Sequence, residues 1–162
     1  MDRLITIAER AGALLKARKE TIAVAESSTG GLVSAALLAV PGASAYFIGG
    51  GVVYTRAARE ALLGIPGSLL RGTAPASEQM AALLAEATRQ RLGATWGLGE
   101  AGAAGPAGNR YGHAAGHGAF AIAGPLGRAR TIETGKTDRV DNMHAFGMTL
   151  LGMLVEALEA AP

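Results

Sequence analysis

The chain of 162 residues contains no cysteine, and aromatic side chains make up only 4% of it. The absence of cysteine excludes disulfides, zinc–thiolate sites and a cysteine nucleophile. Neither sign of charge dominates, because 15 basic residues stand against 13 acidic ones for a net charge of +2. This balance, with few aromatic side chains between scattered arginines, argues against a nucleic-acid-binding surface. We therefore expect no nucleic-acid partner.

The sequence also lacks a secretory signal pattern. No stretch reaches the length that we expect of a membrane span, and charged residues interrupt the apolar positions near the amino terminus. A cytoplasmic protein without membrane contact is the expectation. The chain is long enough to bury a full core, and neither a linker nor an internal repeat divides it. We predict a single domain over residues 1–162.

Apolar periodicity and turn residues predict helices that alternate with strands. Residues 102–118 are interpreted as a glycine-rich loop. The predicted helices cover residues 3–18, 32–39, 56–63, 77–92 and 138–160, and the predicted strands cover 21–25, 45–55 and 95–101, with a hairpin formed by 120–123 and 129–134. This alternation predicts a layered α/β domain, and the closing hairpin makes its sheet mixed.

Residues 25–31, with the sequence AESSTGG, connect a predicted buried strand to a predicted helix. Ser27, Ser28 and Thr29 are candidate nucleophiles, and their hydroxyl oxygens could also cap the helix. The pair Gly30-Gly31 permits backbone conformations that let a ligand approach the main chain. The helix start offers free N–H groups to an anion or a developing oxyanion. The pattern indicates a catalytic turn or a simple helix cap.

A second glycine cluster follows the predicted strand over residues 95–101. Gly102, Gly105 and Gly108 have a spacing that can form a loop whose amides face a phosphate. Many glycine-rich loops only turn the chain, so this cluster by itself is a weak signal.

Five motifs in a fixed order carry a resemblance to a known family. They are an AES-x-TGG turn, a VPG-x-S stop after the second helix, a GG-x-V-x-Y strand ending at Tyr54, an LLGI segment and an AGPxG loop. Together they resemble the CinA carboxy-terminal domain family, which includes stand-alone nicotinamide mononucleotide deamidases. The resemblance implies a three-layer α/β/α sandwich with a mixed sheet, often in a homo-oligomer. It also implies hydrolysis of nicotinamide mononucleotide to nicotinic acid mononucleotide and ammonia, without a metal or cofactor.

The resemblance also assigns roles to residues of this chain. Ser27 matches the nucleophile, and Tyr54 matches a group that relays a proton or orients the ligand. The other matching positions are predicted to bind the ligand, and they are Ser28, Thr29, Gly30, Gly31, Arg59, Gly102, Gly105 and Gly108.

The chain departs from the family pattern at positions that carry chemistry. In the family a lysine five residues after the tyrosine activates the serine, and Arg59 occupies that place. A guanidinium stays protonated and cannot accept the proton of Ser27, although it can hold a phosphate or a carboxylate. Ala101 and Asn109 replace a hydroxyl residue and a glycine. The segment that ends at Asn142 lacks the family's ligand-binding arginine.

Other side chains could replace the missing base. His113 and His117 are candidates because a histidine near its ordinary pKa suits general base catalysis. Lys136 could enter the site from the last loop. For the two histidines, exposed loop positions are the simpler expectation, and no metal site is predicted.

Two hypotheses about function stay open. In the first, the chain is an amidohydrolase in which Ser27 attacks the carboxamide and amides around Gly30 and Gly31 stabilise the oxyanion. In the second, it is a catalytically impaired family member that binds a pyridine nucleotide or a similar small ligand without hydrolysis. The presence of Arg59 favours the second hypothesis, and the family resemblance favours the first. The amidohydrolase is the main prediction, because the motifs support the family's fold and pocket more strongly than any particular loss of activity.

Overall fold

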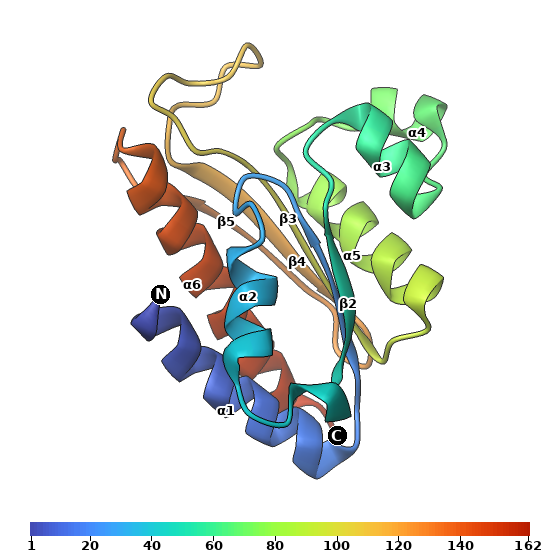
Figure 1. The fold of residues 1–162 in the computed structure, drawn as a ribbon. Coiled ribbons are helices and arrows are strands. Elements are labelled where there is room, and N and C mark those ends of the chain that lie inside the picture. The colour runs from blue at the N-terminus through green and yellow to red at the C-terminus, as the bar shows by residue number, and fades with distance from the viewer.

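The computed structural model describes residues 1–162 and shows helices on both faces of one sheet (Figure 1). In chain order the elements are α1 (Asp2–Arg18), β1 (Ile22–Glu26), α2 (Leu32–Ala39), the short 3-10 helix η1 (Ala43–Ala45), β2 (Phe47–Val52), α3 (Arg56–Leu63), α4 (Gly67–Arg71), α5 (Glu78–Leu92), β3 (Trp96–Ala103), β4 (His117–Ala123), β5 (Arg128–Glu133) and α6 (Arg139–Ala160).

The five strands form a mixed sheet in the order β2-β1-β3-β4-β5. β1 pairs in parallel with β2 and β3, and the hairpin strands β4 and β5 add antiparallel pairs. Helices α1, α2 and α6 cover one face of the sheet, and α3, α4 and α5 lie over the other (Figure 1). The predicted α/β/α sandwich with a mixed sheet is confirmed.

The element boundaries differ from the prediction in three places. The predicted strand over 45–55 is shortened to β2 and follows a 3-10 turn, and α4 was not predicted. The predicted glycine loop over 102–118 is partly strand, because β3 continues to Ala103 and pairs there with His117. Glycine lowers the local strand signal, but pairing with a neighbouring strand overrides that local preference.

Glycine and alanine allow α5 to lie directly on the sheet. A Cβ atom on Gly97 would lie 2.1 Å from the carbonyl oxygen of Ala85, and one on Gly99 would lie 2.0 Å from that of Ala81. The strand can therefore carry no side chain at these two positions. The larger core cluster includes Trp96, which is fully buried.

Helix α6 corrects one expectation from the sequence. By length and composition it is apolar enough to cross a membrane, so the expectation that no stretch reaches this length is wrong. Half of its apolar window, 50%, is buried inside the domain. The core helix of a soluble protein passes the same test, so this property is weak evidence for a membrane span.

Candidate functional site

A cavity of about 530 Å³ lies where the parallel strands end. Ser27 follows β1, Tyr54 follows β2, and Gly102 lies near the end of β3. Ligands of open α/β sheets bind at the carboxyl ends of their strands. The complete lining comes from these strand ends, α3, α5 and the two neighbouring loops, and it consists of Ser27, Tyr54, Thr55, Arg56, Arg59, Pro75, Ala76, Met80, Gly102, Asn109, Arg110 and Tyr111.

Glu26 organises the start of α2 from the end of β1. Its carboxylate accepts hydrogen bonds from the amides of Gly31, Val33 and Ser34 at 2.7–3.1 Å. The hydroxyl of Ser34 donates to it as well. A carboxylate at this end of a helix satisfies free N–H groups and matches the helix dipole. The acid of the turn therefore has a structural role as the cap of α2.

Glu100 on β3 fixes the conformation of the turn by accepting hydrogen bonds from it. It is fully buried, and its carboxylate accepts from the amides of Ser27 and Thr29, each at 2.9 Å. The hydroxyls of Ser28 and Thr29 also donate to this carboxylate. The expectation that Ser28 or Thr29 caps α2 is therefore wrong, because a buried acid requires these donors. Neither residue lines the cavity.

The environment of Glu100 acts on its pKa in two directions. Burial raises the pKa of the Glu100 carboxyl, while the hydrogen bonds from Ser28, Thr29 and Ser27 lower it, and burial has the larger effect. Glu100 is not among the site residues that the sequence predicts. The available signal was one acid within a predicted buried strand, since such acids are seldom buried without partners.

Arg59 is the buried residue of α3, and it lies against the candidate nucleophile. The Nη2 atom of Arg59 donates to the hydroxyl oxygen of Ser27 at 3.3 Å. Its Nε atom donates to the carbonyl of Val53 at 3.0 Å, which fixes the direction of the guanidinium. Ser27 is 5% exposed and Arg59 is 6% exposed, and both line the cavity.

The charge of Arg59 has no direct partner in the chain, because Arg59 takes part in none of the ion pairs. Burial lowers the pKa of its guanidinium, and the nearby charge of Glu100 opposes that change. Arginine remains protonated in proteins even so. Ser27 therefore faces a cation where hydrolysis would need a base.

The turn amides are mostly occupied within the protein. Gly30 donates its N–H to the carbonyl of Ser27 at 3.2 Å, and Gly31 donates to Glu26. These two amides, predicted to stabilise an oxyanion, are therefore already engaged, and neither residue lines the cavity. Among the amides from Ser27 to Gly31, only that of Ser28 makes no hydrogen bond.

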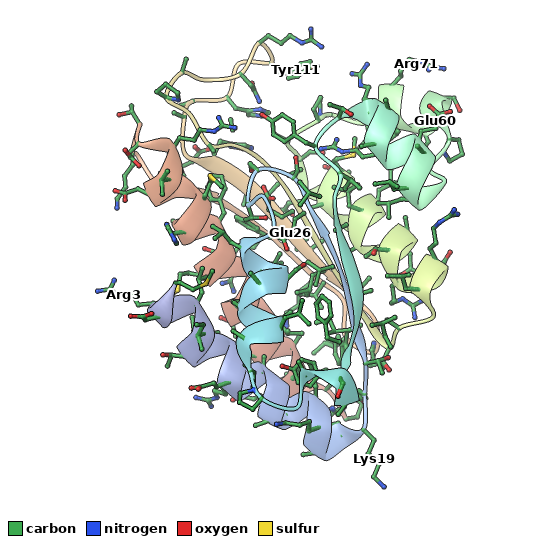
Figure 2. The ribbon with its side chains drawn as sticks, viewed as in Figure 1. Arg3, Lys19, Glu26, Glu60, Arg71 and Tyr111 are labelled. Atoms are coloured by element: carbon green, nitrogen blue, oxygen red, sulfur yellow. The ribbon has the colours of Figure 1, made fainter.

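Tyr54 and the loop between β3 and β4 form the outer part of the site. The side chain of Tyr54 is exposed, and its hydroxyl accepts from Nη2 of Arg139 at 3.3 Å. Tyr111 lies in that long loop, at the end of the molecule where the parallel strands finish (Figure 2). Arg110 stacks on the ring of Tyr111, with 5.0 Å between guanidinium carbon and ring centroid. Sequence reasoning missed these contacts because they depend on where the loop folds back.

Gly105 and Gly108 shape this loop and do not line the cavity. The carbonyl of Gly105 accepts from Nη1 of Arg139 at 2.6 Å, and a Cβ atom on Gly108 would lie 2.3 Å from the carbonyl of His113. The buried amide of Asn142 donates to the carbonyls of Ala104 and Lys136 and so ties the loop to α6. Asn142 is thus a support of the loop outside the cavity lining.

None of the candidate replacement bases lines the cavity that holds Ser27. His117 is buried in β4, so its expected exposed position is wrong. Its Nε2 atom donates to the carbonyl of Ala76 at 2.8 Å, and its Nδ1 atom contacts the carboxylate of Glu133. His113 stacks on this ring at 3.9 Å.

Lys136 lies in a different cavity, of about 510 Å³, which Asp2, Asp141 and His144 also line. Its Nζ atom lies 3.6 Å from a carboxylate oxygen of Asp141. No group of three His, Cys, Asp or Glu side chains is placed to hold a metal ion. The chemistry at Ser27 therefore depends on the serine, the arginine and the groups of the outer loop.

The fold and the site define a class of protein, an α/β domain with a cavity at the carboxyl ends of its parallel strands. Within this class, the family model described as the CinA C-terminal domain matches residues 4–158. The chain belongs to the CinA C-terminal domain family, as its motifs predict.

Curated relatives and a solved structure agree with this assignment. A CinA-like protein of Prochlorococcus marinus (strain MIT 9313) is 47% identical over 114 residues, which are 70% of this chain and 27% of that protein. One from Desulforapulum autotrophicum is 40% identical over 152 residues, 93% of this chain and 36% of that protein. The chain thus spans little more than a third, or less, of these relatives. The crystal structure of a competence/damage-inducible protein from Agrobacterium tumefaciens superposes with a TM-score of 0.89 at 28% identity, covering 97% of this chain and 96% of that one.

Proposed function

We propose that this chain binds a small anionic ligand with an aromatic ring, a pyridine nucleotide or a similar molecule, and does not hydrolyse it. The observation that carries the proposal is the contact between Arg59 and the hydroxyl of Ser27. A serine attacks a carboxamide only when a neighbouring base takes its proton. A protonated guanidinium can only donate, so it leaves Ser27 unactivated.

The lining of the cavity supports an anionic ligand. Arg56, Arg59 and Arg110 contribute three guanidinium groups, and no acidic side chain belongs to the lining. Arginine pairs well with phosphate and carboxylate groups because its donors form a planar fork. Tyr54 and Tyr111 add two aromatic rings that can contact a ring of the ligand. No cofactor is needed for binding of this kind.

A cytoplasmic location is part of this proposal, because a charged nucleotide does not cross a membrane unaided and is met inside the cell. The CinA-like relatives are longer proteins, and this chain matches 27% and 36% of the length of two of them.

The second candidate function is amide hydrolysis of nicotinamide mononucleotide to nicotinic acid mononucleotide and ammonia. It is favoured by the position of Ser27 in the cavity and by the free amide of Ser28, which follows the nucleophile directly. An amide in that place can stabilise an oxyanion. This reaction would require a base that comes from the ligand or from solvent.

Ammonia release distinguishes the two functions. The purified chain is incubated with nicotinamide mononucleotide, alongside Ser27→Ala, Arg59→Lys and the control Arg71→Lys, whose exposed side chain lies outside the cavity. We expect binding without ammonia release by the wild type and by the control, and a gain of turnover in Arg59→Lys.

Two other results, both with ammonia release by the wild type, decide against this expectation. Wild-type turnover that Ser27→Ala abolishes contradicts the binding proposal and establishes the hydrolase. Turnover that Ser27→Ala leaves unchanged shows that Ser27 is not the nucleophile.

A further inference from the structure

The hydrogen-bond donors of Arg59 are only partly used. Its Nε atom and one N–H of Nη2 lie on the same edge of the guanidinium, and they donate to Val53 and Ser27. The Nη1 atom and the second N–H of Nη2 form the end of the group, and this pair donates to nothing in the chain. No buried side-chain nitrogen of the protein lacks a hydrogen-bond partner, so Nη1, which has none, keeps accessible surface, and Arg59 lines the cavity.

The two bonds that Arg59 does make hold this free end in place. The side chain is 6% exposed, and both acceptors belong to the strand ends, namely the carbonyl of Val53 and the hydroxyl of Ser27. A guanidinium fixed in this way offers the two parallel N–H groups of its end and loses little side-chain freedom on binding. Its geometry matches an anion with two oxygens in one plane.

The charge of Arg59 makes this position favour anionic groups of a ligand over neutral ones. Arg59 is buried without an ion pair, and the nearby acid Glu100 already accepts from four donors of the turn. A carboxylate of the ligand would neutralise the guanidinium and accept from both free N–H groups. A carboxamide would offer one oxygen, and its NH₂ group would face the second N–H donor. The site therefore discriminates by charge and by hydrogen-bond pattern together.

A phosphate fits better at the rim of the cavity. Arg56 and Arg110 are exposed, and both line the cavity. At the rim a strongly hydrated dianion keeps part of its water. Its desolvation there costs less free energy than it would beside the buried Ser27. The cavity of about 530 Å³ has room for a ligand with anionic groups at both ends.

We infer that Arg59, held by Ser27 and Val53, is a carboxylate receptor that makes this chain select the acid form of its ligand over the carboxamide form. This inference rests on the proposed function and adds the specificity of the same site. The ligand class is an aromatic carboxylate that carries a second anionic group, such as a phosphate, for the arginines at the rim.

The test compares two ligands that differ only in this group. Nicotinic acid mononucleotide and nicotinamide mononucleotide are titrated by calorimetry at pH 7.5 into the wild type and the control Arg71→Lys. Arg59→Lys is tested in a Ser27→Ala background, so that the amide is not hydrolysed, with Ser27→Ala alone as its matched control. We expect the wild type and the control to bind the acid roughly tenfold to a hundredfold more tightly than the amide. Arg59→Lys keeps the charge and loses the fork, so most of this preference disappears while the mononucleotides still bind.

The outcomes separate this inference from the proposed function. Equal binding of acid and amide by the wild type, a preference for the amide, or a full acid preference in a folded Arg59→Lys overturns the carboxylate receptor and leaves the binding function intact. Failure of both mononucleotides to bind refutes the proposed function. In that case the binding of the fragments nicotinate and nicotinamide is compared by ligand NMR. The carboxylate receptor is supported if nicotinate binds more tightly than nicotinamide and Arg59→Lys removes that advantage. Any other result overturns it.

Discussion

Glu100 determines the conformation of the turn that places Ser27. Four donors from three consecutive residues converge on its carboxylate, and it has no exposed surface. Because burial raises the pKa of this carboxyl, the folded state binds its proton more tightly than the unfolded chain does. The stability of the domain should therefore depend on the protonation of one buried group.

The sign of this dependence can be tested with Glu100→Gln. With a raised pKa in the folded state, the contribution to stability is fully present below the ordinary value of 4.5. It is lost as the pH rises from there toward the raised pKa, by at most about 1.4 kcal/mol per pH unit. We expect the free energy of unfolding of the wild type to fall over this range relative to that of Glu100→Gln. Urea unfolding at a series of pH values measures both.

A matched control is Glu9→Gln, because Glu9 is exposed and makes no side-chain hydrogen bond or ion pair. This control should follow the pH dependence of the wild type. A wild-type curve parallel to that of Glu100→Gln from pH 4.5 upward would show that the four hydrogen bonds outweigh burial and that the carboxyl is ionised throughout.

At the scale of the elements, the contact between α5 and β3 depends on the absence of side chains on the strand. A methyl group on Gly99 would lie 2.0 Å from the carbonyl oxygen of Ala81 on the helix. The helix backbone cannot yield without separating from the sheet. We expect Gly99→Ala to lower the free energy of unfolding by about 3 kcal/mol or more, since overpacking against backbone is at the upper end of its usual cost. Urea unfolding followed by the fluorescence of Trp96, the one tryptophan, measures the change.

The same substitution at Gly152 provides the comparison. Gly152 lies inside α6, and a Cβ atom there would meet nothing within 4 Å. Alanine restricts the unfolded chain and favours the helix, so Gly152→Ala should stabilise the domain by about 0.5–1 kcal/mol. Equal effects of the two substitutions would show that the close packing of α5 on β3 is not what limits stability.

The sequence predicts those elements that local patterns determine. Helical periodicity and turn residues predict five of the helices, and all five strands are predicted, but α4 is too short to produce a pattern. The ends of β3 and β4 are missed because glycines there pair across the sheet. Pairing of this kind is a long-range contact, and no local window of sequence contains it.

The site divides in the same way. The order of the motifs predicts Ser27, Tyr54, Arg59 and Gly102 as site residues, and these four line one cavity. The partners of the turn depend on contacts between distant segments, as the separation of 73 positions between Ser27 and Glu100 illustrates. Arg139 was missed for a related reason, because it reaches Tyr54 from the start of α6. Roles that follow only from the family stay predictions.

At the scale of the whole molecule, the two edges of the sheet differ in character. The edge strand β5 exposes charged side chains, among them Arg128 and Arg130. Charged residues on an edge strand prevent pairing with another chain. The opposite edge, β2, has the sequence FIGGGV without a charge, and it exposes Ile48 and Val52. Of the two edges, β2 is the one open to a second strand.

We expect the chain to form a homo-oligomer in which β2 of one copy pairs with β2 of another. A strand pairs with its own copy about a two-fold axis, so the same apolar residues meet from both sides and bury each other. Ile48→Lys combined with Val52→Lys places like charges opposite one another and should reduce the assembly to a monomer. Size-exclusion chromatography with light scattering measures the mass, and circular dichroism verifies folding. The control Leu69→Lys changes an exposed apolar residue of α4, far along the chain from β2, and should keep the mass of the wild type. A monomeric wild type, or an oligomer that the double substitution leaves intact, would contradict pairing at this edge.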